Sequence, residues 1–183
     1  MALLVIDMLS DWQFPDGETL VRRAETIAPA IAALRRRCSA AGVPCVYVND
    51  NRGRWRSNFA TVVCAALAAG GPGARIAQLL APASTDYFVL KPKHSAFHAT
   101  PLDLLLRHLR VNRVILTGVA CDQCVLATAA DARSHDYDLS IPADCVASQD
   151  ETRCAIALRL LKDSLLADVD RADLIDRPAA SAA

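Results

Sequence analysis

The sequence predicts an α/β domain built on a parallel β-sheet. Short apolar runs of strand length alternate with longer segments of helical periodicity along the chain, which is typical of βαβ units. A length of 183 residues suits one domain, and neither an internal repeat nor a linker divides it. We therefore expect a single domain over residues 1–183, with a frayed tail of small residues at about 177–183.

In the first half of the chain, three apolar runs each end at a polar residue. These predicted strands are Ala2–Ile6, Val43–Val48 and Tyr87–Leu90. Helical periodicity fills the segments between them. The corresponding predicted helices cover about Thr19–Ala41, Asn58–Ala69 and Ala74–Leu80. Gly42 is suited to end the first helix, since glycine adopts the left-handed conformation found at many helix ends.

The second half of the chain continues the alternation. We expect strands at Val114–Thr117 and Asp138–Ile141, and a short sixth strand near Val169. Thr100 suits the N-cap of the next helix and Pro101 its first position. The predicted helices of this half cover Leu102–Leu109, Cys124–His135 and about Asp150–Leu166.

Four polar or reactive side chains lie at or just beyond the ends of predicted strands. They are Asp7, Asp50, Lys91 and Cys124. The carboxyl ends of parallel strands share one edge of a sheet, which is where α/β proteins bind their ligands. We therefore expect these side chains to converge there, although they are far apart in the sequence.

Cys124 is the candidate nucleophile at this edge. It falls in the first turn of a predicted helix, where unpaired N–H groups and the positive end of the helix dipole favour a thiolate. Asp7 is the candidate base, since a carboxylate at the end of a buried strand is partly desolvated, and Lys91 would hold both groups in place. Backbone N–H groups of Ala120 and Cys124 would stabilise an oxyanion. Such a site suits attack on a carbonyl that bears nitrogen, through a thioester-type intermediate.

The motifs that contain these residues are similar to those of a known family. They are LLVIDML, VYVNDNRGRWRS, VLKPKHSAFHATPLDLLL, TGVACDQCVLATAADA and IPADCVAS, and together they extend over nearly the full length. The chain resembles the isochorismatase-like cysteine hydrolases, which include nicotinamidases, N-carbamoylsarcosine amidases and ureidoacrylate-type amidases. The resemblance implies a catalytic triad of Asp7, Lys91 and Cys124, and a homo-oligomer. It also implies a cis peptide bond between Val119 and Ala120, and a three-layer α/β/α sandwich on a six-stranded parallel sheet of order 3-2-1-4-5-6.

Two positions depart from the family pattern. Cys121 stands where many relatives have threonine, and no histidine follows Asp50, where metal-binding nicotinamidases carry ligands. We therefore expect no metal and no other cofactor, and a small amide, ureido or carbamoyl compound as substrate. We expect the pocket walls to include Asn49, Trp55, Phe97 and Cys121, although the loop around Trp55 equally suits a surface or subunit contact. None of the four histidines follows a predicted strand end, so no Cys–His pair is predicted.

Two other classes of function remain open. Cys121 and Cys124 form a C-x-x-C motif at a helix start, which is also the arrangement of dithiol redox proteins. A relative without catalytic activity that only binds a metabolite would have the same motifs.

Composition argues against several kinds of partner. The 20 basic and 20 acidic residues give no net charge, so neither nucleic acid nor an anionic membrane is expected as a partner. No apolar run approaches the ~20 residues that span a bilayer. Seven cysteines without a framework spacing, and a chain that starts directly with a strand, favour free thiols in a cytoplasmic protein.

Overall fold

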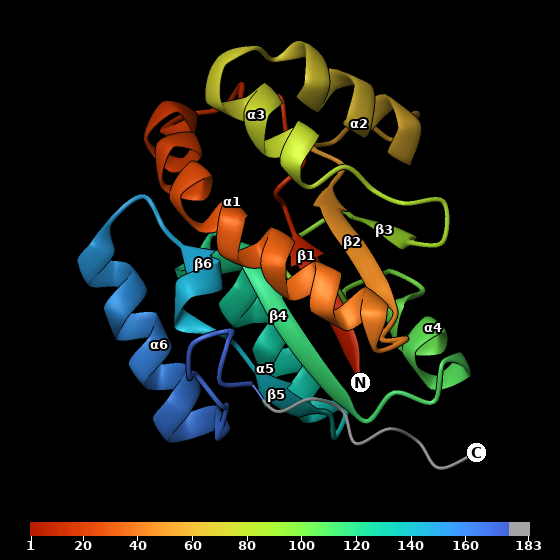
Figure 1. The fold of residues 1–183 in the computed structure, drawn as a ribbon, viewed down its shortest axis with the longest axis vertical. Coiled ribbons are helices and arrows are strands. Elements are labelled where there is room, and N and C mark those ends of the chain that lie inside the picture. Colours follow the sequence, from red (N-terminus) through yellow and green to blue (C-terminus); the bar gives the residue numbers. More distant parts are fainter. Residues whose placement is uncertain (176–183) are drawn as a thin grey trace.

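A six-stranded parallel sheet forms the middle of the molecule (Figure 1). The computed structural model describes residues 1–175, and the predicted frayed tail at about 177–183 lies outside them. The strands pair in the order β3-β2-β1-β4-β5, and β6 also pairs with β4. Their bounds are β1 Ala2–Ile6, β2 Cys45–Asp50, β3 Tyr87–Lys91, β4 Arg113–Val119, β5 Asp138–Ser140 and β6 Val146–Ala147.

Helices cover both faces of this sheet, which confirms the predicted α/β/α sandwich. In Figure 1, α1 crosses in front of the sheet and α5 lies behind it. The bounds are α1 Gly17–Ala40, α2 Phe59–Ala68, α3 Gly71–Leu79, α4 Leu102–His108, α5 Leu126–Ser134 and α6 Glu151–Leu165. A π-helical turn, η1 (Cys121–Val125), joins β4 to α5, and a 3-10 turn, η2 (Ala143–Cys145), precedes β6.

The central strand β1 divides the core into two parts. All five of its residues are buried, and alternate side chains face opposite layers. Leu3 and Val5 belong to the cluster that includes α1 and α3 residues, whereas Leu4 and Ile6 belong to the cluster that includes α4, α5 and α6 residues. A continuous apolar run therefore fits the middle of a sheet covered on both faces.

The sixth strand differs from the prediction in the residues that form it and in its place in the sheet. It is Val146–Ala147, and it pairs with Gly118 and Val119 of β4. Near the predicted strand at Val169, the structure has only an isolated bridge between Ser140 and Asp168. The physical reason is strand length: β4 has seven residues and β5 only three, so β5 and β6 follow one another along the same edge of β4.

In the observed register, the carboxyl ends of β1, β2, β3 and β4 lie at the same edge of the sheet. Ile6 pairs with Val48 on one side and with Gly118 on the other, and Asp50 pairs with Lys91. Gly118 has φ 108°, and a Cβ at this position would lie 2.0 Å from the Ile6 carbonyl oxygen. Only glycine therefore allows β4 to approach β1 so closely at the edge where the polar residues gather.

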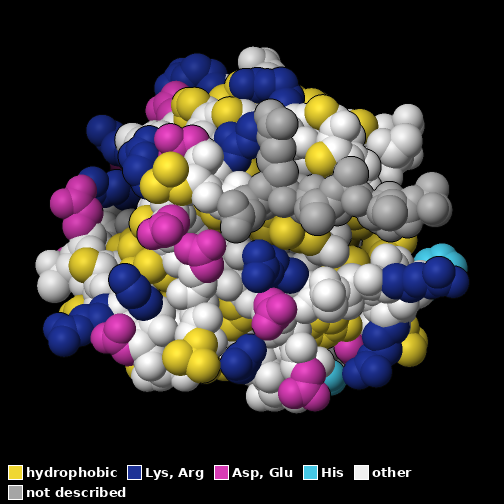
Figure 2. Space-filling model, turned by 60° about the horizontal axis from the view of Figure 1, so that its bottom comes forward, with side chains coloured by type: hydrophobic (Ala, Val, Ile, Leu, Met, Phe, Trp, Pro, Cys, Tyr) yellow, Lys and Arg dark blue, Asp and Glu magenta, His cyan; other side chains and the backbone are white. Residues whose placement is uncertain are grey.

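The surface carries charges of both signs. Figure 2 shows Lys and Arg side chains interspersed with Asp and Glu on the face in view. Among residues 1–175, no helix is both long enough and apolar enough to cross a membrane.

Candidate active site

A cavity of about 620 Å³ opens at the carboxyl edge of the sheet. Its wall includes the segment after β1, the end of β2 with the residues that follow it, part of the loop after β3, and the turn between β4 and α5. Among the predicted site residues, those in the wall are Asp7, Asn49, Ala120 and Cys124. The place of the cavity agrees with the rule that ligands of α/β sheets bind beyond the carboxyl ends of the strands.

Lys91 joins the polar groups of this cavity. Its Nζ lies 2.9 Å from Asp7 Oδ2, 3.3 Å from Cys124 Sγ and 3.6 Å from Asp50 Oδ2. It also donates to the backbone oxygen of Lys93, at 3.3 Å. The Lys91 side chain is fully buried. The structure therefore brings the three residues of the predicted triad together around one buried ammonium group.

Local backbone geometry fixes these side chains. Asp7 directly follows β1 and has a left-handed backbone with φ 54°, a conformation that aspartate tolerates better than most residues. Its Oδ1 accepts a hydrogen bond of 2.7 Å from the Asp50 N–H, which links the ends of β1 and β2. Lys91 is the last residue of β3, opposite Asp50 in the register. The ends of three neighbouring strands thus hold the charged groups in place.

Electrostatics at the site depend on burial and on opposite charges. Burial opposes the charged form of Lys91, but the neighbouring Asp7 and Cys124 outweigh this effect and raise the pKa of the lysine. Burial and the negative charge of Asp7 raise the pKa of Cys124 to about 12, against the lowering effect of Lys91. Lys91 therefore stays protonated, and the Cys124 thiol is neutral until a base takes its proton.

The prediction that the helix start would give Cys124 a thiolate is therefore wrong. Cys124 does lie in the turn that precedes α5, but the turn is a buried π-helical one. Cys124 is only 9% exposed, and desolvation favours the neutral form of its thiol.

The turn around Cys124 has a special backbone. The peptide bond between Val119 and Ala120 is cis. Ala120 O accepts hydrogen bonds from the N–H groups of Gln123 and Val125, and Ser148 Oγ accepts from the N–H of Asp122. Ala120 and Cys124 both line the cavity at this turn, and they stay the predicted oxyanion donors.

Three predicted pocket residues lie outside the cavity wall. Trp55 is 78% exposed on the loop after β2, and Phe97 packs against Tyr137 with ring centroids 5.9 Å apart. Cys121 is fully buried, and its Sγ lies 4.0 Å from the backbone oxygen of Cys154 on α6. Position in the chain did not reveal where the side chains of these residues lie.

His94 lies beside Cys124, a pairing that the sequence did not predict. Its Nδ1 lies 3.5 Å from Cys124 Sγ, and the residue is part of the cavity wall. It lies three residues beyond Lys91, after the predicted strand has ended, so the argument from the carboxyl ends of parallel strands does not apply to it. The available signal was the short spacing from Lys91, since a tight loop returns the chain toward the edge of the sheet.

The part of the chain that the structure covers, residues 1–175, contains no group of three or more His, Cys, Asp and Glu that could hold a metal ion. Both carboxylate oxygens of Asp50 have protein partners: Oδ2 faces Lys91, and Oδ1 accepts a 2.6 Å hydrogen bond from the Arg52 N–H. The expectation of no metal and no cofactor stays a prediction.

Comparison with known proteins agrees with this fold. The sequence model of the isochorismatase domain matches residues 1–173. An uncharacterised isochorismatase family protein from Bacillus subtilis is 37% identical over 168 residues, and the match covers 92% of each chain.

Two solved structures are similar over nearly their whole length. A nicotinamidase from Staphylococcus aureus has a TM-score of 0.73 and 28% identity, over 93% of this chain and 98% of its own. An N-carbamoylsarcosine amidase from Thermoplasma acidophilum has a TM-score of 0.71 and 26% identity, over 96% of this chain and 98% of its own. With the family match over residues 1–173, these likenesses show that the chain belongs to the isochorismatase family.

Proposed function

We propose that the protein is a cysteine-dependent hydrolase that cleaves the C–N bond of a small amide, ureido or carbamoyl compound. The observation that supports this proposal most strongly is the contact of Lys91 Nζ with both Asp7 and Cys124 at the wall of one cavity. The arrangement unites a nucleophile, a proton acceptor and a fixed positive charge, which are the groups that acyl transfer through a thioester requires. The likeness to a nicotinamidase and to an N-carbamoylsarcosine amidase favours a substrate of this class.

In the first half of the proposed reaction, Cys124 Sγ attacks the carbonyl carbon while Asp7 takes the thiol proton. The raised pKa of Cys124 makes this transfer necessary, because the free thiol stays neutral near pH 7. Lys91 keeps its proton, stabilises the Asp7 carboxylate and stabilises the developing thiolate. The N–H groups of Ala120 and Cys124 stabilise the oxyanion. Asp7 then gives its proton to the leaving nitrogen, which departs as ammonia or an amine and leaves a thioester on Cys124.

The first prediction concerns Cys124. We expect Cys124→Ala to abolish ammonia release from a panel of small amides and ureides, because the variant cannot form the thioester. Rapid quenching and mass spectrometry of the wild type should detect an acyl group on Cys124. The matched control is Cys121→Ser, which should retain turnover, since Cys121 packs against α6 outside the cavity.

Other outcomes distinguish the alternatives. Full activity of Cys124→Ala would contradict the assignment of the nucleophile. Ligand binding without any acyl-enzyme would favour a relative that only binds a metabolite. A reversible Cys121–Cys124 disulfide with a defined potential would favour a dithiol redox protein.

A further inference from the structure

We propose that His94 is a second catalytic residue, which transfers protons during hydrolysis of the thioester on Cys124. This inference rests on the function proposed above. It starts from one contact: His94 Nδ1 lies 3.5 Å from the Cys124 sulfur, inside the same cavity. No role in the first half of the reaction, as described above, requires this contact.

The loop that carries His94 is anchored to the helix that follows Cys124. Ser95 Oγ donates a 2.5 Å hydrogen bond to Asp131 Oδ2, and the Ala96 N–H donates one of 3.0 Å to Thr128 Oγ1. Asp131 and Thr128 both belong to α5, which continues the turn of Cys124. The residues directly after His94 are therefore held against α5, which keeps the imidazole close to the sulfur.

The charged groups near the sulfur differ in how they can serve the second half of the reaction. Lys91 has a raised pKa and donates to Asp7, Cys124 and the Lys93 backbone oxygen, so it stays protonated and cannot act as a base. Asp7 completes its proton transfer in the first half, and its two oxygens accept hydrogen bonds from the Asp50 N–H and from Lys91. His94 is exposed, in contrast, and it reaches the sulfur from the wall of an open cavity. It can therefore meet water that enters from solvent and exchange protons with it.

The proposed step balances. Water attacks the carbonyl carbon of the thioester while the His94 imidazole takes one of its protons, and the tetrahedral intermediate then collapses. The C–S bond breaks, the sulfur takes the proton from the imidazolium, and the carboxylic acid leaves. The direct contact between His94 and Cys124 is the geometry that this return of the proton needs. It regenerates the neutral thiol from which the cycle begins.

The test uses p-nitrophenyl acetate as an acyl donor, because its burst of p-nitrophenol reports acylation and its steady state reports deacylation. We choose His94→Asn, whose amide can take the place of Nδ1 but cannot transfer a proton. We expect a burst like that of the wild type, then a steady-state rate lower by ~100-fold, and acetyl-Cys124 detectable by mass spectrometry. Hydroxylamine attacks a thioester without a base, so it should restore turnover of the variant.

Two controls accompany this variant. His98→Asn changes an exposed histidine of the same loop that is not part of the cavity wall, and we expect it to behave like the wild type. Cys124→Ala measures the reaction of other thiols, such as the exposed Cys64, so that it can be subtracted.

The outcomes separate this inference from the proposed function. An unchanged steady-state rate in His94→Asn would overturn the role of His94 and leave the nucleophile assignment intact. A burst that slows as much as the steady state, without acetyl-Cys124 accumulation, would also overturn it, since His94 would then act in acylation. A wild type without any p-nitrophenol release that depends on Cys124 would contradict the proposed function, and this inference with it.

Discussion

At the scale of single residues, the site depends on the balance between one buried cation and two carboxylates. The Lys91 side chain is fully buried, whereas the side chains of Asp7 and Asp50 retain 17% and 33% exposure. The lysine therefore bears the larger desolvation cost, and the two carboxylates keep it charged. Both carboxylates line the cavity and keep part of their solvent exposure, whereas the lysine side chain has none.

The second prediction is that Lys91→Met removes activity and lowers stability together. Met has similar length and no charge, so Asp7 loses its partner at 2.9 Å and Asp50 its partner at 3.6 Å. Loss of one partner of a buried ion pair costs ~3 kcal/mol in free energy of unfolding. Urea denaturation measures this loss. Lys93→Met changes an exposed side chain and keeps the backbone oxygen that Lys91 uses, so its stability should match the wild type. Equal stability of the Lys91 and Lys93 variants would contradict the central role of Lys91.

The sequence revealed the site residues that follow strand ends, and it missed the one that does not. Asp7, Lys91 and Cys124 could be placed together because parallel strands bring their carboxyl ends to one edge. His94 reaches Cys124 through a loop path that depends on hydrogen bonds to α5, and such contacts have no periodicity in the sequence. The protonation state of Cys124 could not be predicted from the sequence either, since it depends on burial and on the distance to Asp7.

At the scale of elements, the pairing of β1 with β4 determines where Asp7 and the turn that contains Cys124 lie. β4 runs alongside β1 for its central residues, and Gly118 meets the carbonyl of Ile6 just before Asp7. The same strand then leads through Val119 and Ala120 into the π-helical turn. A substitution where β1 and β4 pair is therefore expected to affect both the sheet and the site.

The third prediction is that Gly118→Ala lowers the free energy of unfolding by ~3 kcal/mol. Its φ of 108° disfavours a side chain, and the new Cβ would lie 2.0 Å from a backbone oxygen that cannot rotate away. Gly42→Ala is the matched control, because φ is +70° there but no atom lies within 4 Å of the new Cβ. It should cost only ~1 kcal/mol. Equal losses in urea denaturation would show that backbone conformation, and not the close approach of β1 and β4, governs Gly118.

The long elements could be read from the sequence, whereas the shortest strand could not. The predicted strand Ala2–Ile6 and the predicted helix of about Asp150–Leu166 agree with β1 and α6 to within a residue. β6 has only two residues, which is too short to show a hydrophobic pattern. Its place depends on the free part of the β4 edge, which is a property of the folded sheet.

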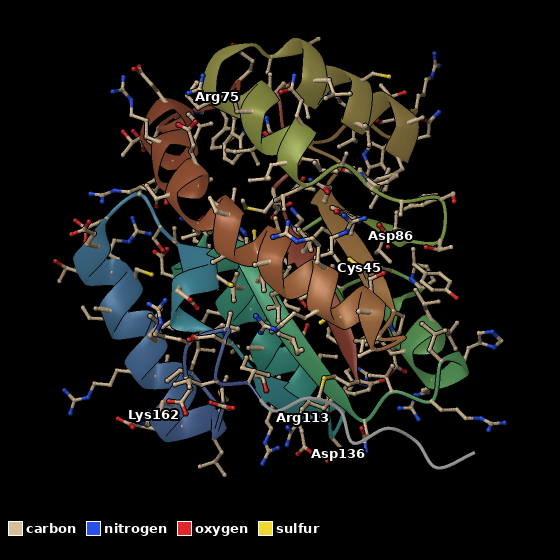
Figure 3. All side chains as sticks on the ribbon, in the orientation of Figure 1. Cys45, Arg75, Asp86, Arg113, Asp136 and Lys162 are labelled. Atoms are coloured by element: carbon tan, nitrogen blue, oxygen red, sulfur yellow. The ribbon has the colours of Figure 1, made fainter. Side chains whose placement is uncertain are left out.

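At the scale of the whole molecule, buried thiols are spread through both halves of the core. Burial raises the pKa of Cys38 to about 11, and that of Cys45, Cys124 and Cys145 to about 12. Asp86 raises the pKa of Cys45 further; both residues are labelled in Figure 3, and Cys45 begins β2 whereas Asp86 directly precedes β3. The folded protein therefore binds thiol protons more tightly than the unfolded chain, in which the thiols titrate near pH 9.

The fourth prediction is a steep loss of stability in alkali. A raised folded-state pKa gives stabilisation that is complete below the unfolded pKa and declines as the pH rises above it. Between pH 8 and pH 10, each such thiol should remove ~1.4 kcal/mol from the free energy of unfolding. Urea denaturation under reducing conditions at both values measures the decline. Cys38→Ala lacks one buried thiol, so its decline should be smaller than that of the wild type by ~1.4 kcal/mol. Cys64→Ala changes an exposed thiol and should leave the decline unchanged. A decline that is the same in all three proteins would contradict the role of buried thiols.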